Sequence, residues 1–283
     1  MSTALFKNAM TIDVEDFFQV SAFSSSIPRE QWDIMPCRIE RNIDLILSLL
    51  DSGQIQATFF TLGWIAERYP SMVRRIIENG HELASHGYDH QRVSDLGRDK
   101  FRDDVTRAKK ILEDLSGRRV TGYRAPSFSI GPNNMWALDI LQETGHLYSS
   151  SIYPIQHDHY GTPSAPRFAH RPRGENGVLE LPPTTSQFMG HNLPASGGGY
   201  FRLLPYKASC WLMHRVNLHD QQPCIFYFHP WELDPHQPRQ TGISLQARFR
   251  HYLNLSRMES RIQALMRDFK WDRMDRIFLK DAA

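Results

Sequence analysis

The sequence has few cysteines, and their spacing excludes a disulfide framework. Three are present, Cys37, Cys210 and Cys224, an odd number without a Cys-x-x-Cys pair. We therefore expect free thiols, buried as small apolar side chains in a protein of a reducing compartment.

An excess of charge of either sign is also missing. The 33 Lys and Arg nearly balance the 31 Asp and Glu, which leaves a net charge of +2. Such a chain has no broad basic field of the kind that holds nucleic acid, so we expect neither nucleic acid nor another polyanion as its partner.

Long hydrophobic runs are absent as well. No stretch approaches the ~20 apolar residues of a membrane span, and residues 1–10 lack the apolar core of a signal peptide. We expect no transmembrane segment and a cytoplasmic location. Internal repeats and obvious linkers are missing too, which predicts one domain over residues 1–283.

What the chain does contain is a repeated alternation of short apolar segments and amphipathic helical patterns, typical of parallel βα units and an α/β fold. Strands are expected at 9–14, 57–61, 82–85, 122–125, 178–181 and 224–228, and helices at 39–51, 70–79 and 99–116. Residues 153–206 are rich in Pro, Gly and His and should form long loops. From about 243 to 270 we expect two helices that turn Leu245 and Phe249 inward.

Three carboxylates lie at the end of the first expected strand. Asp13, Glu15 and Asp16 lie within four residues, and like charges this close repel unless a cation lies among them or one carboxyl stays protonated. The alternative interpretation is structural, a helix N-cap followed by acidic first-turn residues.

A histidine pair follows the third expected strand. His86 and His90 have a spacing that lets both imidazoles reach one divalent ion. Among 13 histidines such a pair can arise by chance, but the end of a strand is where barrel active sites are built. His81 precedes that strand, so we assign it a structural role.

Two further candidates end later strands. Arg124 opens the segment Arg-Ala-Pro-Ser-Phe, and His229 follows the apolar segment Phe-Tyr-Phe. Each is a weak signal alone. A carboxylate cluster, a histidine pair, an arginine and a late histidine, all at expected strand ends, together favour a catalytic site over a structural explanation.

This set resembles the polysaccharide deacetylase family, also called carbohydrate esterase family 4 or the NodB homology domain. The likeness covers residues 11–234, through Ser-His-Gly-Tyr-Asp-His at 85–90 and Arg-Ala-Pro-Ser-Phe at 124–128. The phrases Asp-Val-Glu-Asp-Phe-Phe at 13–18, Gly-Gly-Gly-Tyr-Phe-Arg at 197–202 and Phe-His-Pro-Trp-Glu at 228–232 resemble the branch found with bacterial exopolysaccharide biosynthesis.

The resemblance implies a distorted (β/α) barrel of about seven parallel strands. It also implies a divalent metal, commonly zinc, bound by His86, His90 and one carboxylate. Members often begin with two adjacent aspartates, whereas here Val14 intervenes, so the carboxylate ligand is Glu15 or Asp16. Strand alternation puts Glu15 on the face of Asp13 and favours it slightly. Asp16 would otherwise cap the next helix.

By the same resemblance Asp13 is the general base, Arg124 orients it, and His229 is the general acid. An ion with three protein ligands keeps an open position, which suits hydrolysis of an amide. A backbone N–H near Ser127 or Phe128 would stabilise the oxyanion. The family's aspartate that tunes the acid has no clear counterpart, with Asp158 a weak candidate. His157, His159 and His170 are expected in surface or substrate loops.

These features predict a metal-dependent N-deacetylase acting on the N-acetylated sugars of a polysaccharide or of a lipid-linked glycan precursor. The open alternative is hydrolysis of another amide on the same fold, either a cyclic amide such as allantoin or a small-molecule amide. A glycan-binding protein without turnover is disfavoured, because every expected catalytic role has a residue.

Overall fold

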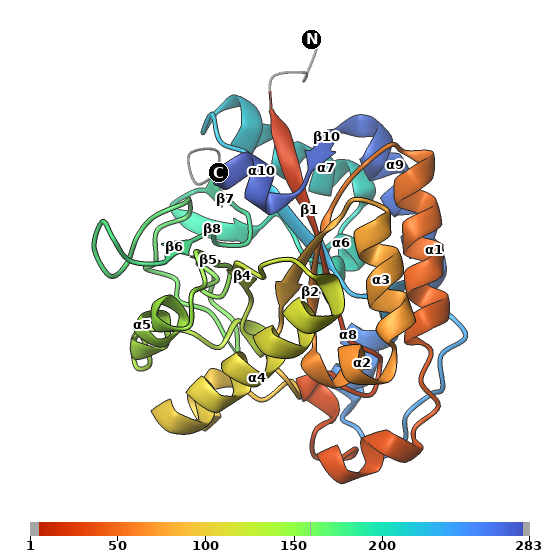
Figure 1. The fold of residues 1–283 in the computed structure, drawn as a ribbon. Coiled ribbons are helices and arrows are strands. Elements are labelled where there is room, and N and C mark those ends of the chain that lie inside the picture. The colour runs from red at the N-terminus through yellow and green to blue at the C-terminus, as the bar shows by residue number, and fades with distance from the viewer. Residues whose placement is uncertain (1–5, 159, 280–283) are drawn as a thin grey trace.

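A computed structural model describes residues 6–158 and 160–279 of the chain. Seven parallel strands form a curled half-barrel flanked by helices, which confirms the expected fold (Figure 1). The strands follow the spatial order β9, β1, β2, β3, β4, β5, β6, and β10 pairs with the first residues of β1. Their bounds are β1 Lys7–Val14, β2 Thr58–Thr61, β3 Glu82–Ser85, β4 Gly122–Tyr123, β5 Tyr148–Ser149, β6 Leu179–Glu180, β9 Ile225–Phe228 and β10 Lys270–Asp272.

The central strand is β1, which is buried from Asn8 to Val14. It pairs in parallel with β2 along one edge and with β9 along the other. A strand covered on both faces is expected to be mainly apolar. In β1 the buried apolar residues Ala9, Met10, Ile12 and Val14 are interrupted by the buried polar residues Asn8, Thr11 and Asp13. One backbone hydrogen bond connects the chain after β6 with β9, the strand at the other edge of the half-barrel. The N–H of Thr184 donates to the carbonyl of Ile225 at 3.3 Å.

Helices flank the sheet and cover its apolar side chains. The predicted helices are confirmed as α1, α3 and α4, and Gly80, with a φ of +81°, follows the end of α3. The helix bounds are α1 Ile39–Ser52, α2 Gly63–Arg68, α3 Pro70–Glu78, α4 Arg98–Ser116, α5 Trp136–Glu143, α6 Gly198–Leu203, α7 Tyr206–Leu218, α8 Leu245–Tyr252, α9 Met258–Asp268 and α10 Met274–Phe278.

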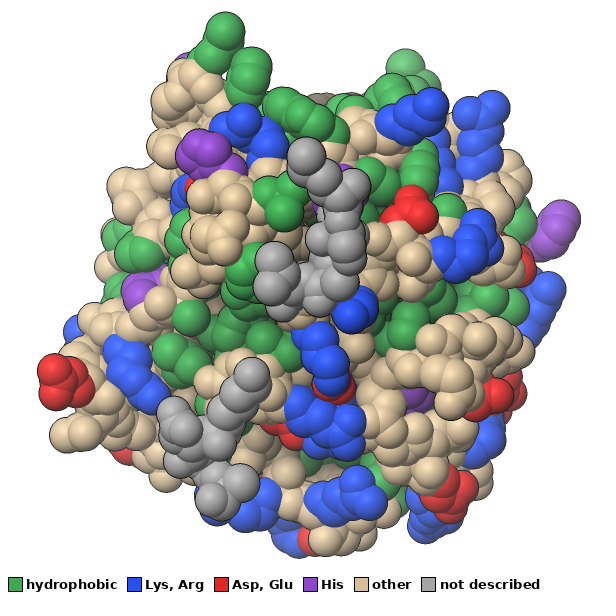
Figure 2. Space-filling view, turned by 90° about the horizontal axis from the view of Figure 1, so that it is seen from above, with side chains coloured by type: hydrophobic (Ala, Val, Ile, Leu, Met, Phe, Trp, Pro, Cys, Tyr) green, Lys and Arg blue, Asp and Glu red, His purple; other side chains and the backbone are tan. Residues whose placement is uncertain are grey.

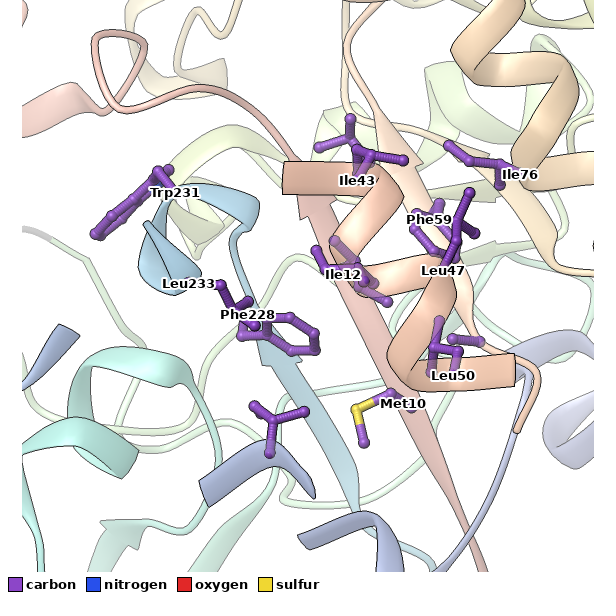
Figure 3. Packing of buried hydrophobic residues seen from close by; sticks show 14 of the residues in the cluster. Met10, Ile12, Ile43, Leu47, Leu50, Phe59, Ile76, Phe228, Trp231 and Leu233 are labelled. Atoms are coloured by element: carbon purple, nitrogen blue, oxygen red, sulfur yellow. The ribbon is translucent and has the colours of Figure 1, made fainter. Parts of the chain in front are cut away.

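The largest core cluster lies between α1 and the sheet. Ile43, Leu47 and Leu50 extend from one face of α1 toward Met10 and Ile12 of β1 (Figure 3). Burying one such side chain stabilises the fold by about 1.5–3 kcal/mol. This packing fixes β1, and therefore the carboxylates that follow it, against the first helix.

The prediction of loops over 153–206 was wrong in part. Besides the strand expected at 178–181, which is β6, the segment contains the antiparallel hairpin of β7 (Thr185–Phe188) and β8 (His191–Pro194), and helix α6. Three of the four residues of β7 are polar, so its sequence has little alternation to detect. In the sequence, the only sign of the hairpin turn is the pair Met189 and Gly190. Both residues adopt positive φ in the structure.

Other expectations need smaller corrections. The two C-terminal helices are present as α8 and α9, but Leu245 and Phe249 are exposed, because they lie on the outer face of α8. Strands β5 and β10 were not predicted. All three cysteines are free thiols, with Cys210 and Cys224 buried and Cys37 partly exposed. His159 lies outside the described residues.

Figure 2 shows the surface at the end of the sheet where β1 begins. Lysines and arginines occur there in separate groups between hydrophobic and neutral side chains. Within the ranges 6–158 and 160–279, no helix combines the length and the apolar character that crossing a bilayer requires.

Candidate active site

The candidate residues lie where parallel strands end. Asp13 is near the end of β1, His86 follows β3, Arg124 follows β4 and His229 follows β9. Because these strands are neighbours in one parallel sheet, their carboxyl ends bring the four side chains to one edge. Residues separated by more than 200 positions thereby share one site.

Glu15, His86 and His90 form a cluster of three possible metal ligands. One ligand atom from each lies within 4.8 Å of the others. Nδ1 of His86 is 2.8 Å from the Arg124 carbonyl and must donate to it, which leaves Nε2 with its lone pair. His90 reaches the cluster from a left-handed backbone conformation, φ 59°, of a kind often found at functional sites.

The chemistry of this cluster fits a divalent cation. Oε2 of Glu15 lies 2.6 Å from Nε2 of His90 but is not aligned for a hydrogen bond, and no hydrogen-bond partner for it occurs among the described residues. Burial opposes ionisation of Glu15, but the charges of His90 and His229 outweigh it and lower its pKa. Burial lowers the pKa of His86 to about 4 and favours the neutral imidazole that a metal requires.

Asp16 faces away from this cluster. Its carboxylate accepts the N–H of Phe17 at 2.8 Å and also the N–H of Arg38, the residue that precedes α1. Burial raises the pKa of Asp16. Its contacts are those of a residue that stabilises the start of α1, the alternative role expected for it.

Asp13 is held by Arg124. Nη1 of the fully buried Arg124 donates to Oδ1 of Asp13 at 2.6 Å and to Thr11 at 2.9 Å. The guanidinium also donates to the carbonyl and the hydroxyl of Ser150, and it lies over the ring of Phe60. With its position fixed from several sides, the guanidinium fixes the orientation of the Asp13 carboxylate.

His229 lies between two groups of carboxylates. Its Nε2 is 3.6 Å from Oε1 of Glu15 and 4.0 Å from Oδ2 of Asp13, and its Nδ1 is 3.1 Å from Oε2 of Glu232. Burial alone would lower the pKa of His229, but Glu15 and Glu232 outweigh burial and raise it to about 9. Trp231 stacks on the imidazole, with ring centroids 5.2 Å apart.

Glu232 and Arg202 are site residues that the sequence interpretation missed. Asp158, the weak candidate for tuning His229, instead pairs with Arg250 at 3.1 Å. Pro230 begins a short 3-10 helix, and Glu232 folds back from it onto the N–H and Nδ1 of His229. The signal was present, since proline at the first position and glutamate at the third are typical of a helix start.

Arg202 holds the far side of Glu232. Its Nε donates to Oε1 of Glu232 at 2.8 Å, and its other nitrogens donate to the carbonyls of Arg250, His251 and Leu253. The glycines before it allow this approach: a Cβ on Gly198 would lie 1.9 Å from Oε2 of Glu232. The phrase Gly-Gly-Gly-Tyr-Phe-Arg therefore packs directly against Glu232, the partner of His229.

One of the two expected oxyanion donors is already engaged. The N–H of Phe128 donates to the Ala125 carbonyl at 3.0 Å. Ser127 has a φ of 53°, and its hydroxyl is 2.7 Å from that of Ser21. Of the two candidates, Ser127 is the one left for this role.

Comparison with known families covers most of the chain in two parts. Residues 31–148 match the model described as polysaccharide deacetylase, and residues 150–279 match a domain of unknown function, DUF3473. The stretch 31–148 thus corresponds to a polysaccharide deacetylase domain. His86, His90 and Arg124 lie in the first range and His229 in the second, while Asp13 precedes both.

Among individual relatives, the chain is 34% identical over 95 residues to a peptidoglycan-N-acetylglucosamine deacetylase of Bacillus cereus, which covers 33% of this chain and 34% of that protein. It is 33% identical over 137 residues to a chitooligosaccharide deacetylase of Azorhizobium caulinodans, covering 48% and 59%. These matches thus span about a third to somewhat over half of the relatives' lengths.

Solved structures share the fold. A Mycobacterium smegmatis protein assigned as a polysaccharide deacetylase has a TM-score of 0.62 at 22% identity, over 95% of this chain and 87% of that one. PuuE allantoinase has 0.60 at 15% identity over the same shares. A carbohydrate esterase family 4 pseudoenzyme of Bacillus anthracis has 0.51 at 14%, over 98% and 66%. The fold thus accompanies different activities, and the site must decide the function.

Proposed function

We propose that this protein removes acetyl groups from N-acetylated sugars by metal-dependent hydrolysis. The observation that carries the proposal is one cluster in which the Arg124-paired Asp13 and the Glu232-paired His229 lie beside Glu15, His86 and His90. The names of the sequence relatives, which act on peptidoglycan or chitooligosaccharides, favour an N-acetylglucosamine unit as the target.

Glu15, His86 and His90 would hold the divalent cation, with zinc the first candidate for a site of one carboxylate and two imidazoles. A cation held there supplies Lewis acidity to the water and to the amide carbonyl. Asp13, oriented by Arg124, takes a proton from the attacking water as the water oxygen bonds to the carbonyl carbon. The N–H of Ser127 would donate to the oxygen that becomes negative.

His229 completes the reaction on the leaving side. Its Nδ1–H donates to Glu232, so the second ring proton is carried by Nε2, the nitrogen nearer to Glu15 and Asp13. As the carbon–nitrogen bond breaks, Nε2 donates this proton to the amine, because an unprotonated amine anion is a poor leaving group. The products are acetate and the free amino sugar.

The finer features of the substrate are part of the same proposal. A polysaccharide of an exopolysaccharide pathway, or its lipid-linked precursor, would present N-acetyl groups to the site at the edge of the sheet. Action in the cytoplasm before export stays a prediction that rests on the amino-acid sequence.

The test is acetate release from N-acetylglucosamine oligomers by the full chain, with metal content measured in parallel. We expect acetate from the parent and a loss of about 100-fold or more in Asp13→Asn, since a general base contributes about 10²–10⁴-fold, with metal content unchanged. Acetate release by Asp13→Asn at the parent's rate would refute the assignment.

Hydrolysis of a cyclic or small-molecule amide is the alternative, and the likeness to PuuE allantoinase shows that such a reaction is compatible with the fold. A substrate panel separates the two. Ring opening of allantoin without acetate release from any N-acetyl glycan would replace the deacetylase proposal.

A further inference from the structure

A patch of exposed hydrophobic side chains lies on the β7–β8 hairpin and helix α7. We call it the hairpin patch. Large apolar side chains that remain exposed mark interaction sites when they gather in one place. Met189 is 84% exposed and Trp211 is 48% exposed. The members of the patch are Phe188, Met189, Leu193, Trp211 and Leu218.

The geometry of the hairpin and of α7 makes this patch continuous. Phe188 pairs with His191, and Leu193 pairs with Ser186. Because residues two apart in a strand point to the same face, as Ser186 and Phe188 do, Phe188 and Leu193 lie on one face of the hairpin. The ring of Phe188 meets that of Trp211 edge to face, with centroids 6.0 Å apart. Leu218 lies seven residues after Trp211 and so on the same face of α7.

The tip of the hairpin is built to project. Met189 and Gly190 adopt positive φ values of 48° and 78°, as in the tight turns that reverse a two-stranded ribbon. Arg215 supports the tip from α7 by donating to the Gln187 carbonyl at 3.3 Å. The turn thus places an unbranched apolar side chain at the outermost point of the hairpin.

The charged side chains of the hairpin and of α7 have one sign. Residues 181–219 contain no Asp or Glu, whereas Lys207 and Arg215 lie one turn before and after Trp211 on α7. Of the acids at the two ends of α7, Asp220 pairs with Arg167 at 2.7 Å, while the exposed Asp268 accepts the neutral Tyr206 hydroxyl. On these two elements the patch is therefore apolar, with cationic residues beside Trp211.

We propose that the hairpin patch docks the protein onto a bilayer of anionic phospholipids. Met189 and Phe188 enter the boundary between headgroups and acyl chains, Trp211 lies at headgroup level, and Lys207 and Arg215 meet the phosphates. A second copy is a poorer occupant, since a symmetric contact would oppose the lysine and arginine of each copy. The proposal is independent of the proposed deacetylation.

The test is sedimentation of the full chain with large vesicles, either of phosphatidylcholine alone or of phosphatidylcholine mixed with phosphatidylglycerol. We expect binding to the mixed vesicles that weakens as salt rises. Met189→Asp should weaken it by about tenfold by placing a charge in the interfacial region, and aspartate tolerates the left-handed backbone there. Lys207→Glu should weaken it as well.

The matched control is Leu245→Asp on α8, since Leu245 is 85% exposed, nearly the same as Met189. It should bind vesicles like the parent. Equal losses in Leu245→Asp and Met189→Asp, or no binding of the parent to mixed vesicles, would overturn the proposal. So would a parent dimer in sedimentation that Met189→Asp dissociates without any vesicle binding. Acetate release from soluble oligomers separately reports the proposed function and should be unchanged in Met189→Asp.

Discussion

At the residue scale, the site contains more than its possible metal ligands, because His229 has a carboxylate partner, Glu232. Glu232 has no room to move, because Arg202 holds one of its oxygens and the backbone of Gly198 lies against the other. The Nδ1 side of the imidazole is thereby fixed. The proposed deacetylation requires such a fixed ring if Nε2 is to meet a leaving nitrogen.

Replacing Glu232 with Gln should slow amide hydrolysis by about 10- to 100-fold, the usual effect of losing a residue that orients a catalytic histidine. An activated ester such as p-nitrophenyl acetate should be much less affected, because its phenolate leaves without a proton. Steady-state kinetics on both substrates measures this.

Arg202 holds Glu232, so its variants test the same contact. Arg202→Lys should lose less activity on the amide than Arg202→Met, since lysine keeps a positive charge beside Glu232. Equal losses on the amide and on the ester would mean that Glu232 serves only the fold.

Replacing Glu15 should affect metal binding, whereas replacing Asp16 should affect stability. Glu15→Gln should lose bound divalent metal. Asp16→Ala should keep the metal and lose about 1–3 kcal/mol of stability, because the Arg38 N–H loses its acceptor. Elemental analysis and urea unfolding of both variants check this. Loss of metal in Asp16→Ala alone would reverse the assignment.

The sequence predicted a large part of this site. Asp13, His86, Arg124 and His229 lie at strand ends as expected, although their catalytic roles stay predictions. Glu232 and Arg202 were missed because their importance arises from the contact between two segments 30 residues apart. Spacing along a chain does not reveal such a contact, and the choice between Glu15 and Asp16 depended on side-chain direction in the same way.

At the element scale, the first turn of α6 offers two adjacent glycines with opposite expectations. A Cβ on Gly198 meets Glu232, whereas a Cβ on Gly199 meets nothing within 4 Å. Gly198→Ala should therefore displace Glu232 and reduce deacetylation by about 10- to 100-fold. Gly199→Ala should keep activity and stabilise the protein by up to about 1 kcal/mol. Thermal unfolding and acetate release measure both, and an inactive Gly199→Ala would contradict this view of α6.

Elements with a strong period or a continuous apolar run were predictable, among them β1, β9, α1 and α4. Strands β5 and β10 have two and three residues and are defined by the neighbours that they pair with. Hairpin β7–β8 exposes apolar residues where the usual pattern would put polar ones. Pairing partners and solvent exposure are tertiary properties, which explains why these elements were missed.

At the scale of the whole molecule, buried carboxyl groups link stability to pH. Glu180 accepts the N–H groups of Ser151 and Ile152 through one oxygen, while burial raises its pKa to about 7. A pKa raised on folding contributes stability below the unfolded value near 4.5, and this contribution is lost as pH rises through 7. Alkaline conditions therefore force a buried charge on the folded protein.

Glu180→Gln cannot ionise and should gain stability relative to the parent between pH 5 and pH 8.5, by about 1–3 kcal/mol. Urea unfolding at the two pH values measures the difference. The exposed Glu175→Gln is the control and should follow the parent at both. A difference between Glu180→Gln and the parent that is constant with pH would show that Glu180 is not protonated in the folded state.

The position of β1 also has a consequence for how the molecule is made. Among the described strands β1 is synthesised first, yet one of its edges pairs with β9 and its first residues pair with β10, which begins at Lys270. During translation β1 can pair with β2, but its other edge stays open until β9 has left the ribosome. The last strand thus closes the first, and a nascent chain stalled before β9 would present an apolar, half-paired ribbon to other nascent chains and to chaperones.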